Sequence, residues 1–405
     1  MNATPRNITS YKPPYFNIAY KNPCFYTTLE EPVSHVSTLH YESNHTTCKL
    51  ACLPYFMVIG FPKCGTTDLW YRLTKQKYIF GPKYKEAHWW NSMNKMNQSS
   101  NSLSVYMDKF ANAIALINGT VKTALKYTSV QQLGPGIKGV RHLYNNTNEM
   151  ETVVYSDSER RKIIFGDFTP GYIWNEDHWL DQKANKYLNE PLTLTPHRIK
   201  HILPKTKFII MVRNPVDRLW SDFRFHCDIN FTSVLEQQMY FHNKSLIAIQ
   251  WWNRCINKHN KTAKQCAYGN NYPESLRTLS YFNCSGLIGP CRRFRDSWLV
   301  NPADALRRGI YYVFIREWLK VFPKDNVLVV NFEKYTQDPF KYIRQLILPF
   351  LDVNDFEYMT EEAEAQLNYT TKIEMLPETR TMLSRFYERY NKHLFALLKM
   401  KDFGW

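Results

Sequence analysis

The sequence predicts an α/β fold in which helices flank a mostly parallel β-sheet. Four short apolar runs rich in β-branched residues have the length and composition of buried strands. These runs are 55–60, 162–165, 208–212 and 327–331. Helical spacing of apolar residues appears in 66–75, 216–226, 310–321 and 378–398. Strands that alternate with helices are typical of parallel sheets, so these segments form the predicted core.

Two segments differ from this core. Residues 1–53 are polar, contain prolines and show little periodicity, so we expect a stem or N-terminal arm before a domain that spans 54–405. Residues from about 228 to 300 contain four cysteines and few long apolar runs, which indicates an insertion braced by disulfides. Short loops would be closed by pairing Cys255 with Cys266 and Cys284 with Cys291, although the sequence leaves other pairings open.

The composition narrows the class of partner and the compartment. The 405 residues include 52 Lys and Arg against 36 Asp and Glu, a net charge of +16, which attracts polyanions such as nucleic acid, anionic membranes or acidic polysaccharides. Nine cysteines without CxxC spacing and eleven Asn-x-Ser/Thr sequons favour an oxidising, glycosylating compartment. The sequence has no apolar run of about 18 residues and no signal-peptide pattern, so we expect the lumenal part of an anchored protein, or a secreted form.

The first functional motif is Gly60-Phe-Pro-Lys-Cys-Gly-Thr-Thr67, between the first predicted strand and its helix. It is P-loop-like, because its glycines have the spacing of G-x-x-x-x-G-K-[ST], but Thr66 replaces the lysine and Lys63 lies mid-loop instead. Backbone N–H groups and a helix N-terminus remain available for a phosphate. We expect Lys63 to face the outer side of that anion, near the bond to be broken.

A nucleotide kinase remains a rival interpretation of this loop. Such an enzyme needs a magnesium-binding aspartate at the end of a neighbouring strand. Asp167 follows the 162–165 run and fits that position.

The second motif is Arg213-Asn-Pro-Val-Asp-Arg-Leu-Trp-Ser221, which follows the 208–212 run. Pro215 is suited to the first turn of a helix, and Ser221 follows Arg213 by eight residues, about two helical turns. Arg213 and Ser221 are therefore predicted to bind one further phosphate at the carboxyl edge of the sheet.

Together these motifs resemble sulfotransferases that use 3′-phosphoadenylyl sulfate (PAPS). Pro62-Lys-Cys-Gly-Thr-Thr67 is similar to their 5′-phosphosulfate loop, and 213–221 is similar to their 3′-phosphate motif, in the same order. The likeness continues through 309–323, 327–339 and 375–380 and covers roughly 54 to 405, apart from part of the insertion. It is greatest to the Golgi carbohydrate group typified by N-acetylgalactosamine 4-sulfate 6-O-sulfotransferase, and next to the heparan sulfate enzymes.

The resemblance implies a role for each motif residue. Lys63 would steady the charge that grows on the leaving oxygen, and the amides of Cys64, Gly65, Thr66 and Thr67 would hold the phosphosulfate. Arg213 and Ser221 would hold the 3′-phosphate. Lys372, in the loosely matched C-terminal loop, is either a further phosphate contact or a solvated lysine.

The segment Lys83-Tyr-Lys-Glu-Ala-His-Trp-Trp90 resembles the one that carries the general base of heparan sulfate O-sulfotransferases. Glu86 takes the position of the base, His88 is the alternative, and Lys85 and His88 flank it as acceptor contacts. Nearby cations would lower the pKa of Glu86 and burial would raise it, and the sequence leaves this balance open. Trp89 either lines the acceptor cleft or belongs to the core.

Other features qualify the resemblance. Gly166-Asp-Phe-Thr-Pro-Gly171 lacks the lysine of the corresponding heparan-enzyme motif, so those acceptor contacts cannot be transferred. Cys64 is expected to be a free thiol without a nucleophilic role, and no residues have the spacing of a metal site.

The sequence thus predicts a PAPS-dependent carbohydrate O-sulfotransferase of the Golgi lumen. Its expected partner is an acidic polysaccharide, with chondroitin or dermatan sulfate favoured, and not nucleic acid. The alternatives are the kinase and a non-catalytic glycan-binding protein on the same fold.

Overall fold

A computed structural model describes residues 12–28, 41–43, 46–92, 103–127, 150–176, 179, 187–188, 190–227, 229, 231–269, 302–354 and 373–405. Its centre is a five-stranded sheet in the order β10-β9-β4-β8-β5, and every neighbouring pair is parallel. The strands are β4 Phe56–Gly60, β5 Ile79–Phe80, β8 Ile164–Asp167, β9 Lys207–Val212 and β10 Val327–Asn331. The predicted α/β fold and all four predicted strands are confirmed, whereas the two-residue strand β5 was not predicted.

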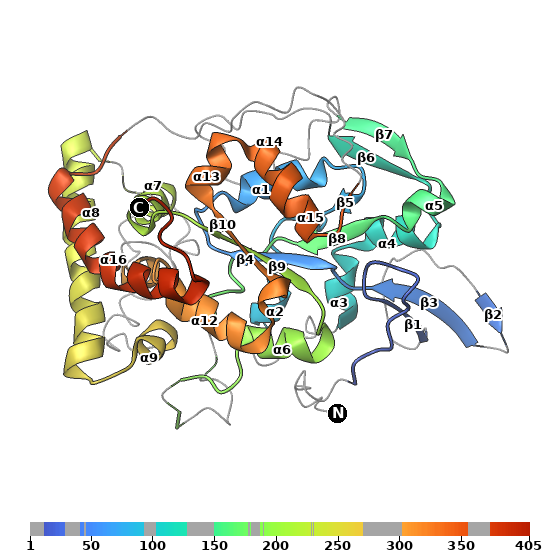
Figure 1. Cartoon of the computed structure of the whole chain (residues 1–405), viewed down its shortest axis with the longest axis horizontal. Coiled ribbons are helices and arrows are strands. Elements are labelled where there is room, and N and C mark those ends of the chain that lie inside the picture. Colours follow the sequence, from blue (N-terminus) through green and yellow to red (C-terminus); the bar gives the residue numbers. More distant parts are fainter. Residues whose placement is uncertain are drawn as a thin grey trace, which may run out of the picture.

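Helices cover both faces of this sheet, as Figure 1 shows. On the upper side in that view lie α1 Thr66–Thr74, α13 Phe332–Gln337, α14 Pro339–Tyr342 and α15 Leu348–Phe350, with the helical turn Ile343–Ile347 between the last two. On the lower side lie α2 Trp89–Ser92, α3 Leu103–Asp108, α6 Thr195–Ile202 and α12 Tyr311–Val321. Their predicted members, α1 and α12, begin and end within one residue of the predicted segments.

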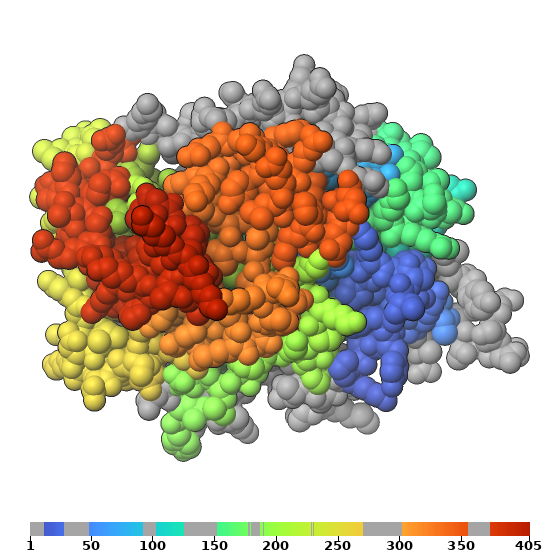
Figure 2. Space-filling view, in the orientation of Figure 1, coloured from blue at the N-terminus to red at the C-terminus, as the bar shows by residue number. Residues whose placement is uncertain are grey.

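Two further groups of helices complete the domain. One end is built from α7 Pro215–His226, α8 Val234–Asn253, α9 Ala263–Tyr268, α11 Pro302–Arg307 and α16 Pro377–Leu398. The helical turns Arg254–Lys258 and Lys324–Asn326 follow α8 and α12. Figure 2 shows α16 and the last residues packed beside the segment 302–354 on the displayed face. The predicted helices 216–226 and 378–398 correspond to α7 and α16 and are confirmed.

The opposite end carries two small antiparallel sheets. β1 Cys24–Thr28, β3 Thr46–Cys52 and β2 Tyr41–Ser43 form one, and β6 Thr123–Tyr127 with β7 Met150–Val154 forms the other. Helices α4 Ala111–Asn118 and α5 Asp157–Arg160 flank the second sheet in sequence. A disulfide joins Cys24 to Cys52, and both are fully buried, so this part of the expected N-terminal arm packs on the domain. The boundary after residue 53 remains a prediction.

The expected insertion begins with the long helix α8. A disulfide joins Cys255 to Cys266, as one of the two suggested pairings predicts. Cys284 and Cys291 lie outside the described residues. Among the helices of the described ranges, none combines the length and apolarity that crossing a bilayer requires.

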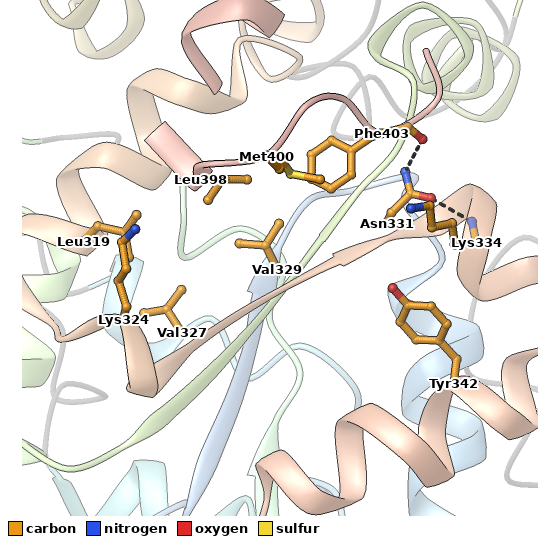
Figure 3. A pocket seen from close by; sticks show the side chains of 10 residues that line it. All are labelled: Leu319, Lys324, Val327, Val329, Asn331, Lys334, Tyr342, Leu398, Met400 and Phe403. Atoms are coloured by element: carbon orange, nitrogen blue, oxygen red, sulfur yellow. Dashed lines mark hydrogen bonds between the residues drawn. The ribbon is translucent and has the colours of Figure 1, made fainter. Parts of the chain in front are cut away.

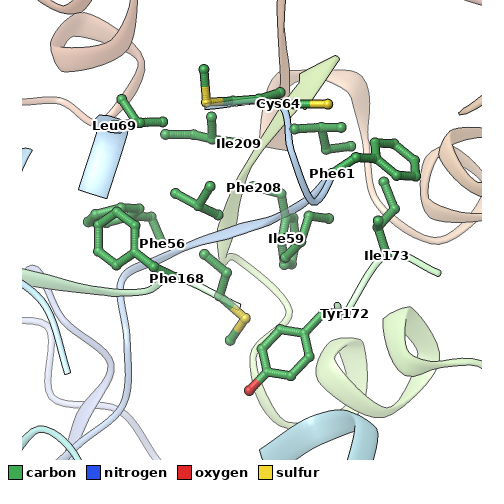
Figure 4. Packing of buried hydrophobic residues seen from close by; sticks show 14 of the residues in the cluster. Phe56, Ile59, Phe61, Cys64, Leu69, Phe168, Tyr172, Ile173, Phe208 and Ile209 are labelled. Atoms are coloured by element: carbon green, nitrogen blue, oxygen red, sulfur yellow. The ribbon is translucent and has the colours of Figure 1, made fainter. Parts of the chain in front are cut away.

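The core lies directly beneath the loop that follows β4. Phe56, Ile59 and Phe61 pack with Phe208 and Ile209 of β9, and all five are fully buried (Figure 4). Their continuous burial explains why β4 and β9 appear in the sequence as unbroken apolar runs. The core therefore fixes the two strand ends from which the functional loops emerge.

Candidate active site

The loop between β4 and α1 has the geometry of an anion cradle. Gly65 occupies the N-cap of α1 with φ of 83°, and no side chain caps the first turn, so the N-terminal amides of α1 have no side-chain acceptor. The loop is anchored to the neighbouring strand, because the amide of Phe61 donates to the carbonyl oxygen of Met211 over 2.8 Å. Thr66 is buried at the start of the helix and Thr67 is half-buried.

Arg213 lies beside this loop, at the end of the adjacent strand β9. Its Nη1 donates to the carbonyl oxygen of Lys63 over 3.3 Å. The hydroxyl of Tyr311 donates to the carbonyl oxygen of Arg213 over 2.8 Å and lies 3.7 Å from the sulfur of Cys64. The two predicted phosphate motifs therefore meet at one edge of the sheet, joined by a buried tyrosine of α12.

The ring of Phe332, the first residue after β10, supports both motifs. The guanidinium of Arg213 lies 4.8 Å from the ring centroid, a cation–π contact. A Cβ atom on Gly65 would lie 2.7 Å from two carbons of the same ring. Only glycine fits this position without displacing Phe332, and the positive φ of the residue favours glycine too.

Lys63 supplies an ammonium group from within the loop itself. Its Nζ lies 3.7 Å from the centroid of the Phe225 ring on α7. Burial is the main cause that lowers the pKa of Lys63, Asp222 acts in the opposite direction, and the cations Arg213, Lys85 and Arg218 add to the lowering, so that the pKa is about 8. The concentration of positive charge indicates a site for an anion, because bound negative charge would relieve the mutual repulsion.

Ser221 lies on the half-exposed face of α7, one helical turn before Phe225. Lys63 contacts that same face through the Phe225 ring. Pro215 begins α7, as predicted, and the side chain of Asn214 caps the helix by accepting from the amide of Val216 over 3.0 Å. This position would allow one ligand to contact Ser221 together with Lys63 and Arg213.

Glu86 stands between two basic groups. Nζ of Lys85 lies 2.7 Å from Oε1, and Nε2 of His88 lies 3.1 Å from Oε2. Burial acts to raise the pKa of Glu86, but Lys85 and His88 outweigh it and lower the pKa to about 2. The balance that the sequence left open is therefore decided by these two neighbours, and Glu86 is ionised at neutral pH.

Asp167 ends β8 in a position that does not suit a magnesium ligand. Its side chain is fully buried and accepts hydrogen bonds from the hydroxyls of Tyr106, Thr169 and Tyr172 over 2.7, 2.6 and 2.8 Å. Burial raises the pKa of Asp167, while the three hydroxyls act to lower it. Since these donors occupy the carboxylate, the expectation that supported a kinase loses its basis.

The remaining predicted residues have mixed placements. Trp89 is 3% exposed and stacks on Tyr106 at a centroid distance of 4.8 Å, so its ring belongs to the core and not to an open cleft. Cys64 is a free, buried thiol, and burial raises its pKa to about 11, which keeps it protonated at neutral pH. Lys372 lies outside the described residues.

A cavity borders the sheet, and one of its lining residues, Asn331, directly precedes Phe332. It has a volume of about 310 Å³ along the edge strand β10 (Figure 3). Its lining residues are Leu319, Lys324, Val327, Val329, Asn331, Lys334, Tyr342, Leu398, Met400 and Phe403. None of them is a predicted site residue.

Several residues that lie outside the motifs in sequence but contact them in the fold were not identified from the sequence. Tyr311, Phe332 and Phe225 contact the phosphate motifs from three different elements, and Tyr172 and Thr169 contact the loop that carries Glu86. Tyr172 and Thr169 follow Asp167 by five and two residues, so the clustering of polar groups after a buried strand was the available signal.

Comparisons with known proteins show the family of the chain. A family model described as "Sulfotransferase domain" matches residues 53–380. Carbohydrate sulfotransferase 15 of Mus musculus is 27% identical over 92% of this chain, and that of Homo sapiens is 25% identical over 88%. The chain spans only 57% and 55% of the lengths of these two relatives.

Among solved structures, a sulfotransferase from Alicyclobacillus acidocaldarius covers 86% of this chain and 97% of its own, with 18% identity and a TM-score of 0.40. The family model includes both the loop of Lys63 and the strand end of Arg213 in its match. The chain therefore belongs to the sulfotransferase domain family.

Proposed function

We propose that the protein transfers a sulfuryl group from PAPS to a hydroxyl group of a glycosaminoglycan-type sugar. The observation that carries this proposal is the contact between Arg213 and the Lys63 loop, 3.3 Å from guanidinium nitrogen to carbonyl oxygen. PAPS carries a 5′-phosphosulfate and a 3′-phosphate on one adenosine, and it needs two adjacent anion sites. The cradle at residues 63–67 suits the first, and Arg213 with Ser221 suits the second.

The reaction breaks the bond from sulfur to the bridging phosphate oxygen and forms a bond from sulfur to the acceptor oxygen. The acceptor hydroxyl loses its proton to the carboxylate of Glu86, and adenosine 3′,5′-bisphosphate leaves. Lys63 neutralises the negative charge that develops on the bridging oxygen. Positioning and charge neutralisation dominate such in-line transfers, as in phosphoryl transfer.

The low pKa of Glu86 makes it a weak base while Lys85 remains paired with it. Lys85 is close enough to Lys63 for their charges to interact. An anionic donor beside Lys63 would attract Lys85 as well, which weakens its hold on Glu86 and raises the pKa of that carboxylate. In this proposal Lys85 couples the binding of PAPS to the pKa of Glu86.

The acceptor class rests on the relatives and on the charge. The two relatives described above are carbohydrate sulfotransferases, and the net charge of +16 suits an acceptor that already bears carboxylates or sulfates. Within this class we favour chondroitin or dermatan sulfate, from the motif resemblance. The sequons and the two disulfides support a site of action in the Golgi lumen.

The decisive assay incubates the chain with sulfur-labelled PAPS and a panel of chondroitin, dermatan and heparan sulfates, followed by disaccharide analysis. Label should enter one class of disaccharide, and Lys63→Ala and Glu86→Ala should abolish transfer. Magnesium-dependent ATP turnover without sulfate transfer would support the kinase. Glycan affinity that survives both substitutions, without transfer by the unchanged protein, would support the non-catalytic binding protein.

A further inference from the structure

Asp167 is a buried acid for which the proposed reaction has no direct use. Three hydroxyl groups donate to its carboxylate, one from α3 and two from the residues that follow β8. A buried carboxylate is costly unless such donors satisfy it. Its strand β8 lies beside β4, with Asp167 paired to Met57, three residues before β4 ends at Gly60 and the phosphate loop begins.

Two of these hydroxyls also accept hydrogen bonds from the loop that carries Glu86. Tyr172 accepts from the amide of Trp89 over 3.1 Å, and Thr169 accepts from the amide of His88 over 3.4 Å. Because both hydroxyls give their hydrogen to Asp167, their lone pairs are free to face the two amides. Each series of hydrogen bonds runs from a loop amide to a hydroxyl and from that hydroxyl to the carboxylate. Asp167 sets this direction, because its carboxylate can only accept.

The loop needs such support because its backbone is strained. Glu86 and His88 have φ of 72° and 53°, in the left-handed region that non-glycine residues rarely adopt. Each such residue costs of the order of 1 kcal/mol and persists only where the surroundings hold it. The two amides held by Thr169 and Tyr172 belong to His88 and to the residue after it, at the end of the strained turn.

We propose that Asp167 is a positioning residue for Glu86, acting through Tyr172 and Thr169 on the backbone of residues 88 and 89. This inference rests on the proposed function, since it assumes that Glu86 accepts a proton from the acceptor. The aspartate that first suggested a metal site instead orients the base. Its role is separate from donor binding, because Lys63 and Arg213 belong to other loops.

Two tyrosines offer a matched pair of variants. Tyr172→Phe and Tyr106→Phe each remove one hydroxyl from Asp167, but only Tyr172 also contacts a backbone amide of the loop. The hydroxyl of Tyr106 interacts with the side chains of Asp167 and Trp90, and its ring, which stacks on Trp89, is retained in phenylalanine.

The expected result is a selective loss of turnover. In Tyr172→Phe and in Asp167→Asn, kcat should fall by roughly 10- to 100-fold, the loss typical of a misplaced reacting group, while the Kd for adenosine 3′,5′-bisphosphate stays within about 2-fold. Tyr106→Phe should keep most of its kcat. Amide hydrogen exchange of residues 84–90 should accelerate in Tyr172→Phe and not in Tyr106→Phe, which measures the loop independently of activity.

The outcomes separate this inference from the proposed function. Equal kcat and equal exchange in the two tyrosine variants, with Glu86→Gln inactive, would overturn the positioning role and leave the function intact. Full activity in Glu86→Gln would overturn the positioning role together with the assignment of Glu86 as the base, and the transfer activity itself would stand. Absence of sulfate transfer by the unchanged protein would overturn the proposed function, and the positioning role with it. Loss of bisphosphate binding in Tyr172→Phe would mean that the hydrogen bonds of Asp167 stabilise the whole fold. This result would also overturn the specific positioning of Glu86 by Asp167.

Discussion

The guanidinium of Arg213 rests against the loop of Lys63, with Nη1 3.3 Å from the carbonyl oxygen of Lys63. The two residues are 150 positions apart in sequence and come from the ends of neighbouring parallel strands. Their side chains also interact through charge, because Arg213 contributes to the lowered pKa of Lys63. Because the two cations repel each other, the site favours a ligand that carries more than one negative charge.

Activity should decline at alkaline pH because Lys63 loses its charge. Lys63 is cationic below its pKa of about 8 and neutral above it, so kcat/KM for PAPS should fall about tenfold per pH unit above that value. Lys63→Arg should remove this decline, since a guanidinium stays charged, although kcat will be lower through altered geometry. A pH–rate profile of both proteins provides the measurement. If Lys63→Arg shows the same loss of activity at alkaline pH, the loss is caused by deprotonation of a group other than Lys63.

At acidic pH, Lys85→Gln should expose the titration of the base. Lys85 lowers the pKa of Glu86, so its removal should move that pKa upward from about 2, toward or above the ordinary value of 4.5. Activity of Lys85→Gln should therefore disappear as the pH falls through roughly 4 to 5, whereas the unchanged protein keeps its activity there. If His88 is the base instead, Lys85→Gln and the unchanged protein will lose activity over the same pH range. His88→Asn distinguishes the two cases.

Gly65→Ala should disrupt the cradle, and Gly404→Ala provides a control. Both glycines have positive φ, 83° and 90°, but a Cβ at Gly65 would lie 2.7 Å from the Phe332 ring, whereas one at Gly404 has no atom within 4 Å. Gly404→Ala should cost only about 1 kcal/mol of unfolding free energy. Gly65→Ala should cost about 2–4 kcal/mol and weaken binding of adenosine 3′,5′-bisphosphate. Denaturant unfolding and calorimetry measure the two effects, and equal losses at both positions would contradict the packing argument.

The Cys255–Cys266 disulfide should matter for stability and not for catalysis. It closes a loop of 11 residues between the end of α8 and α9, and a loop of this size contributes about 2–3 kcal/mol. The double variant Cys255→Ala/Cys266→Ala should unfold more easily by that amount and keep its kcat. Each single variant should lose as much as the double, because either one breaks the bridge. Additive losses from the two single variants would show that side-chain packing, and not the bridge, carries the effect.

The sequence predicted those parts of the fold that depend on local pattern. β4, β8 and β9 are almost entirely buried, and the edge strand β10 is half-buried over its first three residues. Each of the four appears in the sequence as a short apolar run, and the two phosphate motifs follow the ends of β4 and β9. The sheet formed by β1, β2 and β3 has no comparable periodicity and depends on pairing and on the Cys24–Cys52 bridge. Such contacts cannot be deduced from spacing alone.

The same limit applies to the site. The positions of Lys63 and Arg213 follow from strand ends, but the pKa of Glu86 depends on distances to Lys85 and His88 that only the folded loop sets. The surroundings of Asp167 were unpredictable for the same reason. Its partner Tyr106 is 61 residues away in sequence and donates a hydrogen bond to the carboxylate, a contact that the sequence does not reveal.

The central claim is that one nucleotide with two phosphate sites is held by the Lys63 loop and by Arg213. Isothermal titration calorimetry with adenosine 3′,5′-bisphosphate and adenosine 5′-monophosphate, on the unchanged protein and on Arg213→Ala, tests it most directly. The bisphosphate should bind the unchanged protein more tightly by about 1.5–3 kcal/mol, the contribution of a charge-assisted hydrogen bond, and Arg213→Ala should abolish that difference while the monophosphate binds as before. Equal affinity of the two nucleotides for the unchanged protein, or an equal loss of both in Arg213→Ala, would contradict the claim.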